Sequence, residues 1–129
     1  MLTATLGSPY EIDTKDRILF IEEVGERPYR IDKMLTALSL AGKFRDCSGI
    51  IFGTFTDCDD PSPEQLSLNA ITAGGSLTVK EIIEEVVLPY KKPVLWGLQA
   101  GHSYPNITLP MGARISMDPD DKSANLQVL

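Results

Sequence analysis

The sequence is poor in the residues that build metal and disulfide sites. It has one histidine, His102, and two cysteines, Cys47 and Cys58, in 129 residues. A single histidine leaves no zinc constellation, so no metal ion is expected. Two cysteines are too few for a disulfide framework in a chain of this size, which favours a reducing compartment, with the cytoplasm as the simplest location. No apolar run approaches the roughly 20 residues of a membrane span, and the first residues lack the basic lead and apolar core of a signal peptide.

Basic residues are also scarce. The 12 Lys and Arg are outnumbered by 18 Asp and Glu, which gives a net charge of −6, and the basic residues are scattered along the chain. Nucleic acids and anionic membranes both demand clustered positive charge, so neither is expected as a main partner. With 43% hydrophobic residues the composition is that of an ordinary globular protein, and the length suits one domain.

Short, mostly apolar runs predict buried strands at 17–21, 48–55 and 93–97. Between the first two strands, Pro28 opens a helix that stops at Gly42, because proline favours the first helical turn and glycine the position after the last. One face of this helix is apolar at the i, i+3, i+4 and i+7 positions, which are Ile31, Met34, Leu35 and Leu38.

After the second strand, Thr78 and Glu81 fit a capping box that opens another helix with one apolar face. Segments 113–117 and 125–129 predict a closing hairpin. The order of these elements predicts an α/β domain with a mixed sheet, two main helices and a terminal β-hairpin. In such a domain the parallel crossovers come first and the antiparallel pairing comes at the end.

Two segments fit this pattern less well. Leu2, Ala4 and Leu6 look like the end of a helix that runs into Gly7, which suggests a chain cut from something longer. The polar stretch 56–77 is too long for an ordinary connection, so it is either a surface insertion or a functional loop. The acidic residues at its start match no calcium-binding spacing and are expected to be solvated.

Candidate catalytic residues follow two of the predicted strands. Glu22 and Glu23 stand where the first strand ends, the edge at which open α/β sheets place their ligands, and strand alternation sends them to opposite faces. His102 lies in a loop after the third strand, and an imidazole can exchange a proton near neutral pH. A carboxylate bonded to one ring nitrogen would leave the other free to take a proton from a hydroxyl. The plainer interpretation, in which all three side chains are solvated surface groups, stays open at this point.

Other residues carry weaker signals. Trp96 lies inside a strand pattern and is expected in the core rather than in a ligand site. The glycosylation sequon at Asn106 is attributed to chance in a chain without a secretory signal. No glycines form a phosphate-binding loop, and no cofactor is expected.

Several segments together resemble one family, the LD-carboxypeptidases, with their relatives the microcin C self-immunity proteins. The segments are LGSPYEID (6–13), ILFIEEVGERPYRIDKMLTAL (18–38), GIIFGTFTDCDD (49–60), PVLWGLQAGH (93–102) and PNITLPMGARISMD (105–118). Members of this family have an amino-terminal domain that holds a nucleophilic serine and a carboxy-terminal domain of swivelling β/β/α type. The resemblance covers residues 1–129 as the second domain only.

The resemblance implies cleavage of the terminal D-alanine from a murein tetrapeptide during peptidoglycan recycling. By position, the catalytic glutamate falls on Glu22 and the histidine on His102, with Glu23 as the register alternative. No serine lies in a segment that matches the nucleophile motif. Ser103 is next to His102 in the sequence, but this adjacency alone does not identify it as the nucleophile. The serine of this Ser-Glu-His triad would then belong to the amino-terminal domain of the same protein, and this chain alone is expected to be inactive. Members commonly dimerise, so a homodimer is a further expectation.

Two other functions stay open. The immunity relatives hydrolyse peptidyl-nucleotide antibiotics, which is an alternative reaction for the same residues. The other alternative is a domain that binds a peptide or a partner protein without catalysis.

Overall fold

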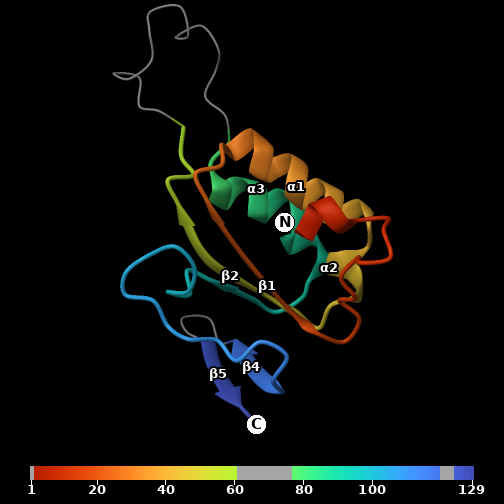
Figure 1. Ribbon diagram of the computed structural model, residues 1–129, viewed down its shortest axis with the longest axis vertical. Helices are drawn as coiled ribbons and strands as arrows, with labels where there is room; N and C mark the ends of the chain where they lie inside the picture. The colour runs from red at the N-terminus through yellow and green to blue at the C-terminus, as the bar shows by residue number, and fades with distance from the viewer. Residues whose placement is uncertain (1, 61–76, 120–123) are drawn as a thin grey trace, which may run out of the picture.

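The structure is a computed structural model that describes residues 2–60, 77–119 and 124–129 (Figure 1). Most of the stretch 56–77, for which a surface insertion and a functional loop were both considered, lies outside the described residues.

A parallel sheet forms the centre of the fold. It consists of β1 (Ile18–Val24), β2 (Gly49–Thr56) and β3 (Val94–Trp96), in the order β1-β2-β3. The three predicted strands are confirmed. However, β1 continues to Val24, so that Glu22 and Glu23 lie inside the strand rather than after it.

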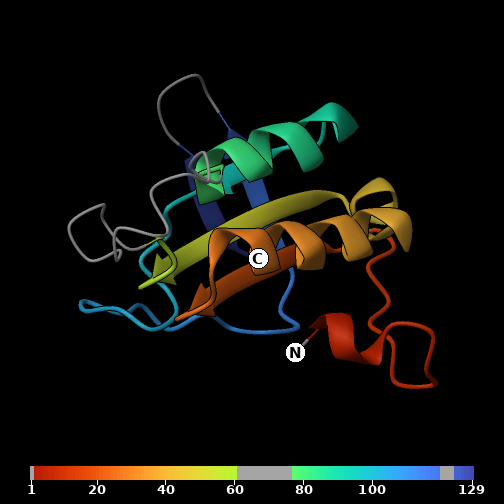
Figure 2. The same cartoon turned by 90° about the horizontal axis from the view of Figure 1, so that it is seen from above.

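The helices lie on one face of this sheet. α1 (Pro28–Leu40) and α3 (Val79–Val86) run side by side above β1 and β2 (Figures 1 and 2). Both helices are confirmed, with proline in the first turn of α1 and a complete capping box at the start of α3. Two short elements were not predicted, α2 (Lys43–Asp46) and η3 (Leu88–Tyr90), because so few residues show no periodicity. In the described part of the chain no helix is long and apolar enough to cross a bilayer.

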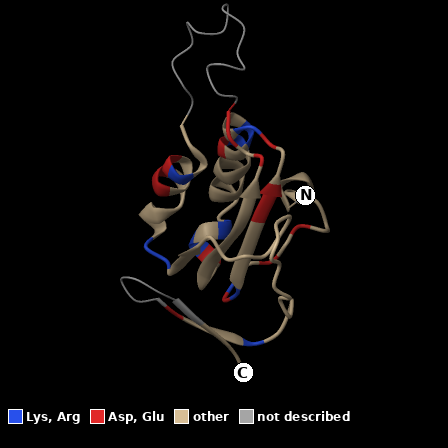
Figure 3. Cartoon of the chain, turned by 90° about the vertical axis from the view of Figure 1, so that its left-hand side faces the viewer, with Lys and Arg blue, Asp and Glu red and all other residues tan. Residues whose placement is uncertain are grey.

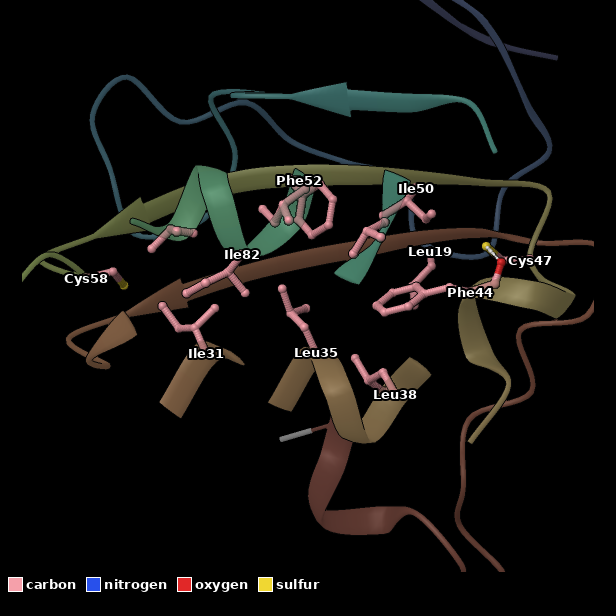
Figure 4. Packing of buried hydrophobic residues seen from close by; sticks show 13 residues of the cluster. Leu19, Ile31, Leu35, Leu38, Phe44, Cys47, Ile50, Phe52, Cys58 and Ile82 are labelled. Carbon is pink, nitrogen blue, oxygen red and sulfur yellow. Dashed lines mark hydrogen bonds between the residues drawn. The ribbon is translucent and has the colours of Figure 1, made fainter. Parts of the chain in front are cut away.

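The hydrophobic core fills the space between the helices and the sheet (Figure 4). Alternation along β1 and β2 sends Leu19, Ile50 and Phe52 to the helix face, where they meet the apolar faces of α1 and α3. Phe20 consequently points to the opposite face, and this second face carries the site described below. The residues buried most completely in the core are Phe44, Phe52, Ile31, Ile50, Ile82, Val87, Cys47 and Cys58.

The chain ends in the predicted hairpin, β4 (Ile115–Pro119) paired antiparallel with β5 (Ala124–Val128). The α/β class is therefore confirmed, with parallel pairing first and antiparallel pairing last. The two kinds of pairing lie in two separate sheets rather than in one mixed sheet. The physical reason is that β3 is short: the φ of +78° at Gly97 ends the regular strand, and an irregular loop then separates the hairpin from the parallel sheet.

The amino-terminal segment begins with η1 (Leu2–Thr5), a short 3₁₀ helix instead of the last turn of an α-helix. Leu2 and Leu6 pack against the core. The segment is fastened by Lys43, whose ammonium donates to the Ile12 carbonyl at 2.8 Å and pairs with the Glu11 carboxylate at 2.5 Å. This ion pair lowers the pKa of Glu11. The anchored segment places η1 beside α1.

The capping box of α3 gives a first prediction. The Thr78 hydroxyl accepts a hydrogen bond from the Glu81 amide at 3.3 Å, and the Thr78 amide donates to the Glu81 carboxylate at 2.8 Å. Thr78→Ala should lower the free energy of unfolding by about 1 kcal/mol, whereas Thr78→Ser should change it little. Urea unfolding near neutral pH measures both, and an alanine variant as stable as the wild type would contradict the cap.

The same box has a pH dependence. Hydrogen bonds from the Thr78 amide and hydroxyl lower the pKa of Glu81 in the folded protein. The stability that this carboxylate contributes is therefore present above its unfolded-state pKa and is lost as the pH falls through the lower, folded value. The stability difference between wild type and Thr78→Ala should shrink in acid, which urea unfolding at acidic pH measures.

Candidate active site

The structure brings together two of the predicted site residues. Nδ1 of His102 lies 2.8 Å from Oε2 of Glu22, across 80 residues of sequence. The Glu22 side chain is 26% exposed and that of His102 is 61% exposed, so the carboxylate is half-buried under a ring that reaches solvent. Within the parallel sheet the charged residues lie on β1 alone (Figure 3).

Glu22 is positioned by a β-bulge. Ile21 pairs with Phe52 and Glu23 pairs with Phe55, so Glu22 alone lies opposite two residues of β2, Gly53 and Thr54. A bulge bends its strand and redirects nearby side chains, and it is a common feature next to active sites. Here it lies where the histidine loop meets β2 at Gly53 and Thr54.

The histidine loop is held by hydrogen bonds from the carboxyl end of β2 to carbonyl groups of the loop. The Thr54 amide donates to the Ala100 carbonyl at 3.0 Å, and the Thr56 hydroxyl donates to the His102 carbonyl at 2.8 Å. The loop passes so close to β2 that a Cβ at Gly53 would collide with the Ala100 carbonyl and the Phe20 ring. The loop therefore lies on the Phe20 face of the sheet, opposite the helices.

Gly101 allows the histidine to approach the glutamate. Its φ is +129°, and a Cβ at this position would lie 2.7 Å from the Thr54 hydroxyl and 2.8 Å from Oε2 of Glu22. Its amide donates to the side-chain oxygen of Asn106 at 3.2 Å, which closes the loop on itself. The side chain of the sequon residue thus has a structural role here.

A cavity of about 390 Å³ opens beside the pair. It lies along the outer edge of β1, between η1 and α1, and Glu22, Glu23, Phe55 and His102 are among the residues that line it. Its other walls are mostly apolar side chains of η1 and α1. The arrangement therefore presents an imidazole and its carboxylate partner in the lining of a mostly apolar space.

Glu23 does not take part in the pair. Its carboxylate accepts a hydrogen bond from the Val24 amide at 2.9 Å. Glu23 lines the same cavity as Glu22, but this hydrogen bond is to the backbone and not to the His102 ring. Trp96 departs from the expectation that it would lie in the core: it stacks on Phe55 with ring centroids 5.5 Å apart and remains 45% exposed, because β3 is the other edge of the sheet.

Chemically, the pair has the parts of a general base. Glu22 accepts from Nδ1–H of the neutral ring, which leaves Nε2 with a lone pair to take a proton. Among the described serines none is hydrogen-bonded to this ring, and the buried hydroxyl of Ser103 has no hydrogen-bond partner among the described residues. Burial raises the pKa of the nearby Cys58 thiol, which disfavours a thiolate nucleophile.

Sequence reasoning missed Gly101, Thr54 and Thr56. Their contribution is to bring the loop against β2, and this depends on two segments that meet only in the folded chain. The one available signal was the glycine directly before the sole histidine, since a glycine often marks a close approach of backbone.

A sequence profile described as the LD-carboxypeptidase C-terminal domain matches residues 1–117. The chain belongs to the LD-carboxypeptidase family. It is 36% identical over 127 residues to the probable murein peptide carboxypeptidase of Bacillus subtilis, covering 98% of this chain and 37% of that protein. It is also 31% identical over 129 residues to the microcin C7 self-immunity protein MccF of Escherichia coli, covering 97% of this chain and 33% of that protein.

A solved structure agrees with this assignment to the LD-carboxypeptidases. The chain is similar to the crystal structure of a muramoyltetrapeptide carboxypeptidase from Oxalobacter formigenes, with a TM-score of 0.77 and 26% identity. The likeness covers 98% of this chain and 41% of that one. The expected family and fold class are thus confirmed, and the chain spans well under half the length of each of these relatives.

The backbone at Gly101 gives a further prediction. Gly101→Ala should strain the backbone and also push apart Glu22 and Thr54, so its cost should exceed the about 1–3 kcal/mol of a strained conformation alone. Gly97→Ala is the matched control, because its φ of +78° is also positive but no described atom lies within 4 Å of the added Cβ. Urea unfolding compares the two variants. Equal losses of unfolding free energy in the two variants would contradict the close approach of Gly101 to Glu22 and Thr54.

Proposed function

We propose that this chain is the carboxy-terminal catalytic half of a serine LD-carboxypeptidase, which removes the terminal D-alanine from murein tetrapeptides in peptidoglycan recycling. The observation that carries the proposal is the 2.8 Å contact between Glu22 and Nδ1 of His102, two residues that also line a cavity. Family membership and the names of the relatives, a murein peptide carboxypeptidase and a muramoyltetrapeptide carboxypeptidase, support the substrate class.

In the proposed mechanism, Nε2 of His102 takes the proton from a serine hydroxyl as that oxygen attacks the carbonyl before D-alanine. The ring becomes an imidazolium, and the Glu22 carboxylate stabilises this charge while holding the ring in place. His102 then gives the proton to the leaving amine of D-alanine. In the second half of the reaction the same nitrogen activates a water molecule, which releases the acyl group from the serine.

We propose that the serine comes from the amino-terminal domain of the same protein. Two observations support this: none of the described serines bonds to His102, and the chain spans 37% of the length of the Bacillus subtilis relative. The 61% exposure of the His102 side chain fits a ring that meets a nucleophile on another domain. The proposal includes action in the cytoplasm without a cofactor, and the formation of a homodimer.

The pair can be tested in the chain joined to a serine-bearing amino-terminal domain, with release of D-alanine from tetrapeptide as the assay. His102→Ala should lower kcat by roughly 10⁴-fold or more, because the base is lost. Glu22→Gln should lower kcat by about 10⁴-fold, because an amide neither fixes the productive tautomer nor stabilises the imidazolium.

Glu23→Gln is the matched control for Glu22→Gln. It makes the same change one residue away, on a carboxylate that bonds its neighbouring amide rather than His102. It should cost far less activity than Glu22→Gln. A larger loss at Glu23 than at Glu22 would show that the pair has been assigned in the wrong register.

The chain without that domain should release no D-alanine above background, since the nucleophile is absent from the pair. Adding a peptidyl-sulfamoyl adenylate as a second substrate of the joined protein tests the alternative reaction, which the likeness to MccF brings into consideration. Faster cleavage of this compound than of tetrapeptide would overturn the proposed substrate. Activity in the isolated chain would overturn the proposed origin of the serine.

A further inference from the structure

The carboxyl end of β2 continues to pair after β3 has ended. Beyond Trp96 the amides of Gly97 and Leu98 both donate to the Phe52 carbonyl at 3.1 Å, and the Thr54 amide donates to the Ala100 carbonyl at 3.0 Å. These bonds attach the loop to β2 as an irregular extension of the sheet, and they stop two residues before the histidine.

The contact nearest the histidine is made by a side chain. The Thr56 hydroxyl donates to the His102 carbonyl at 2.8 Å, in the place where a regular strand would supply a backbone amide. Thr56 is itself firmly held, because it pairs with Val24 and its carbonyl accepts from the Gly25 amide at 2.9 Å. It therefore joins the end of β1, two residues after Glu22, to the backbone of His102.

We propose that Thr56 is a positioning residue for the catalytic histidine, whose hydroxyl fixes the His102 backbone so that the ring meets Glu22 through Nδ1. The expected effect of Thr56 on the reaction rate rests on the function proposed above, whereas its expected effect on the orientation of the His102 ring does not. A 61% exposed side chain has few neighbours to hold it by packing, so the orientation of its backbone decides where the ring lies. Catalysis is sensitive to this placement, since a displacement of about 1 Å can cost roughly 10²-fold in rate.

The other contacts of the loop do not replace this one. The Gly101 amide is bonded to Asn106 and the Ile107 amide to the Gln99 carbonyl, both within the loop, so they shape it without fixing it to β1 or β2. The Thr54 contact fixes Ala100, but Gly101 lies between that point and the histidine, and a glycine transmits orientation poorly because its backbone is permissive.

Thr56→Val tests the proposal by removing the hydroxyl at nearly constant shape, and Thr56→Ser restores the donor. The readout is the tautomer of the neutral imidazole in this 129-residue chain, measured by ¹⁵N NMR, in which the sole histidine gives an unambiguous signal. The wild type and Thr56→Ser should carry the proton on Nδ1, and Thr56→Val should shift it towards Nε2. Thr36→Val is the matched control, because Thr36 is exposed on α1 and its hydroxyl bonds only to the Asp32 carboxylate among the described residues.

In the protein joined to the serine-bearing domain, Thr56→Val should lower kcat by about 10- to 100-fold with KM little changed, and Thr56→Ser should recover most of the loss. If the joined protein lacks carboxypeptidase activity, the proposed function is overturned. The role of Thr56 is then still decided by the His102 tautomer measured in the 129-residue chain. A folded Thr56→Val chain with the wild-type tautomer would overturn the positioning role. Failure of both Thr56→Val and Thr56→Ala to fold would overturn it as well, because the hydroxyl would then serve the fold rather than the ring.

Discussion

The contact between the Glu22 carboxylate and Nδ1 of His102 joins β1 to the loop after β3 at 2.8 Å. The carboxylate is half-buried, so its charge is poorly hydrated and gains from an N–H donor. The ring, in turn, is exposed and would be mobile without that carboxylate. Each group therefore fixes the other, and the chemistry that the fold can offer depends on bringing a strand residue and a loop residue within one hydrogen bond.

Several local features make this approach sterically feasible. The bulge opposite Glu22 and the two glycines at 53 and 101 allow the loop backbone to pass directly over the carboxyl end of β2. The helix face of the same sheet bears the hydrophobic core, and the histidine loop lies on the other face. The cavity beside the pair is also lined by Ile31, Leu35 and Leu38, so core residues of α1 supply part of its apolar wall.

Sequence patterns predicted the elements that have strong periodicity or capping signals. Pro28, the apolar face of α1 and the Thr78–Glu81 box are local signals, and the helices they predict are present. The pairing of Glu22 with His102 was predicted from the family resemblance, and the place of Glu22 at a strand end agreed with the edge at which open α/β sheets bind ligands. The bulge, the role of Thr56 and the exposure of Trp96 could not be predicted, because they depend on which backbone segments touch and on which strands are the edges.

We propose that the exposed imidazole and its carboxylate partner are an incomplete catalytic unit, which a serine from another domain completes. The most direct test is a crystal structure of the chain joined to the amino-terminal domain of its own protein. The account predicts a serine hydroxyl oxygen about 2.6–3.2 Å from Nε2 of His102, with Nδ1 still bonded to Glu22. A structure in which the two domains are docked and no serine hydroxyl lies within reach of Nε2 would contradict it.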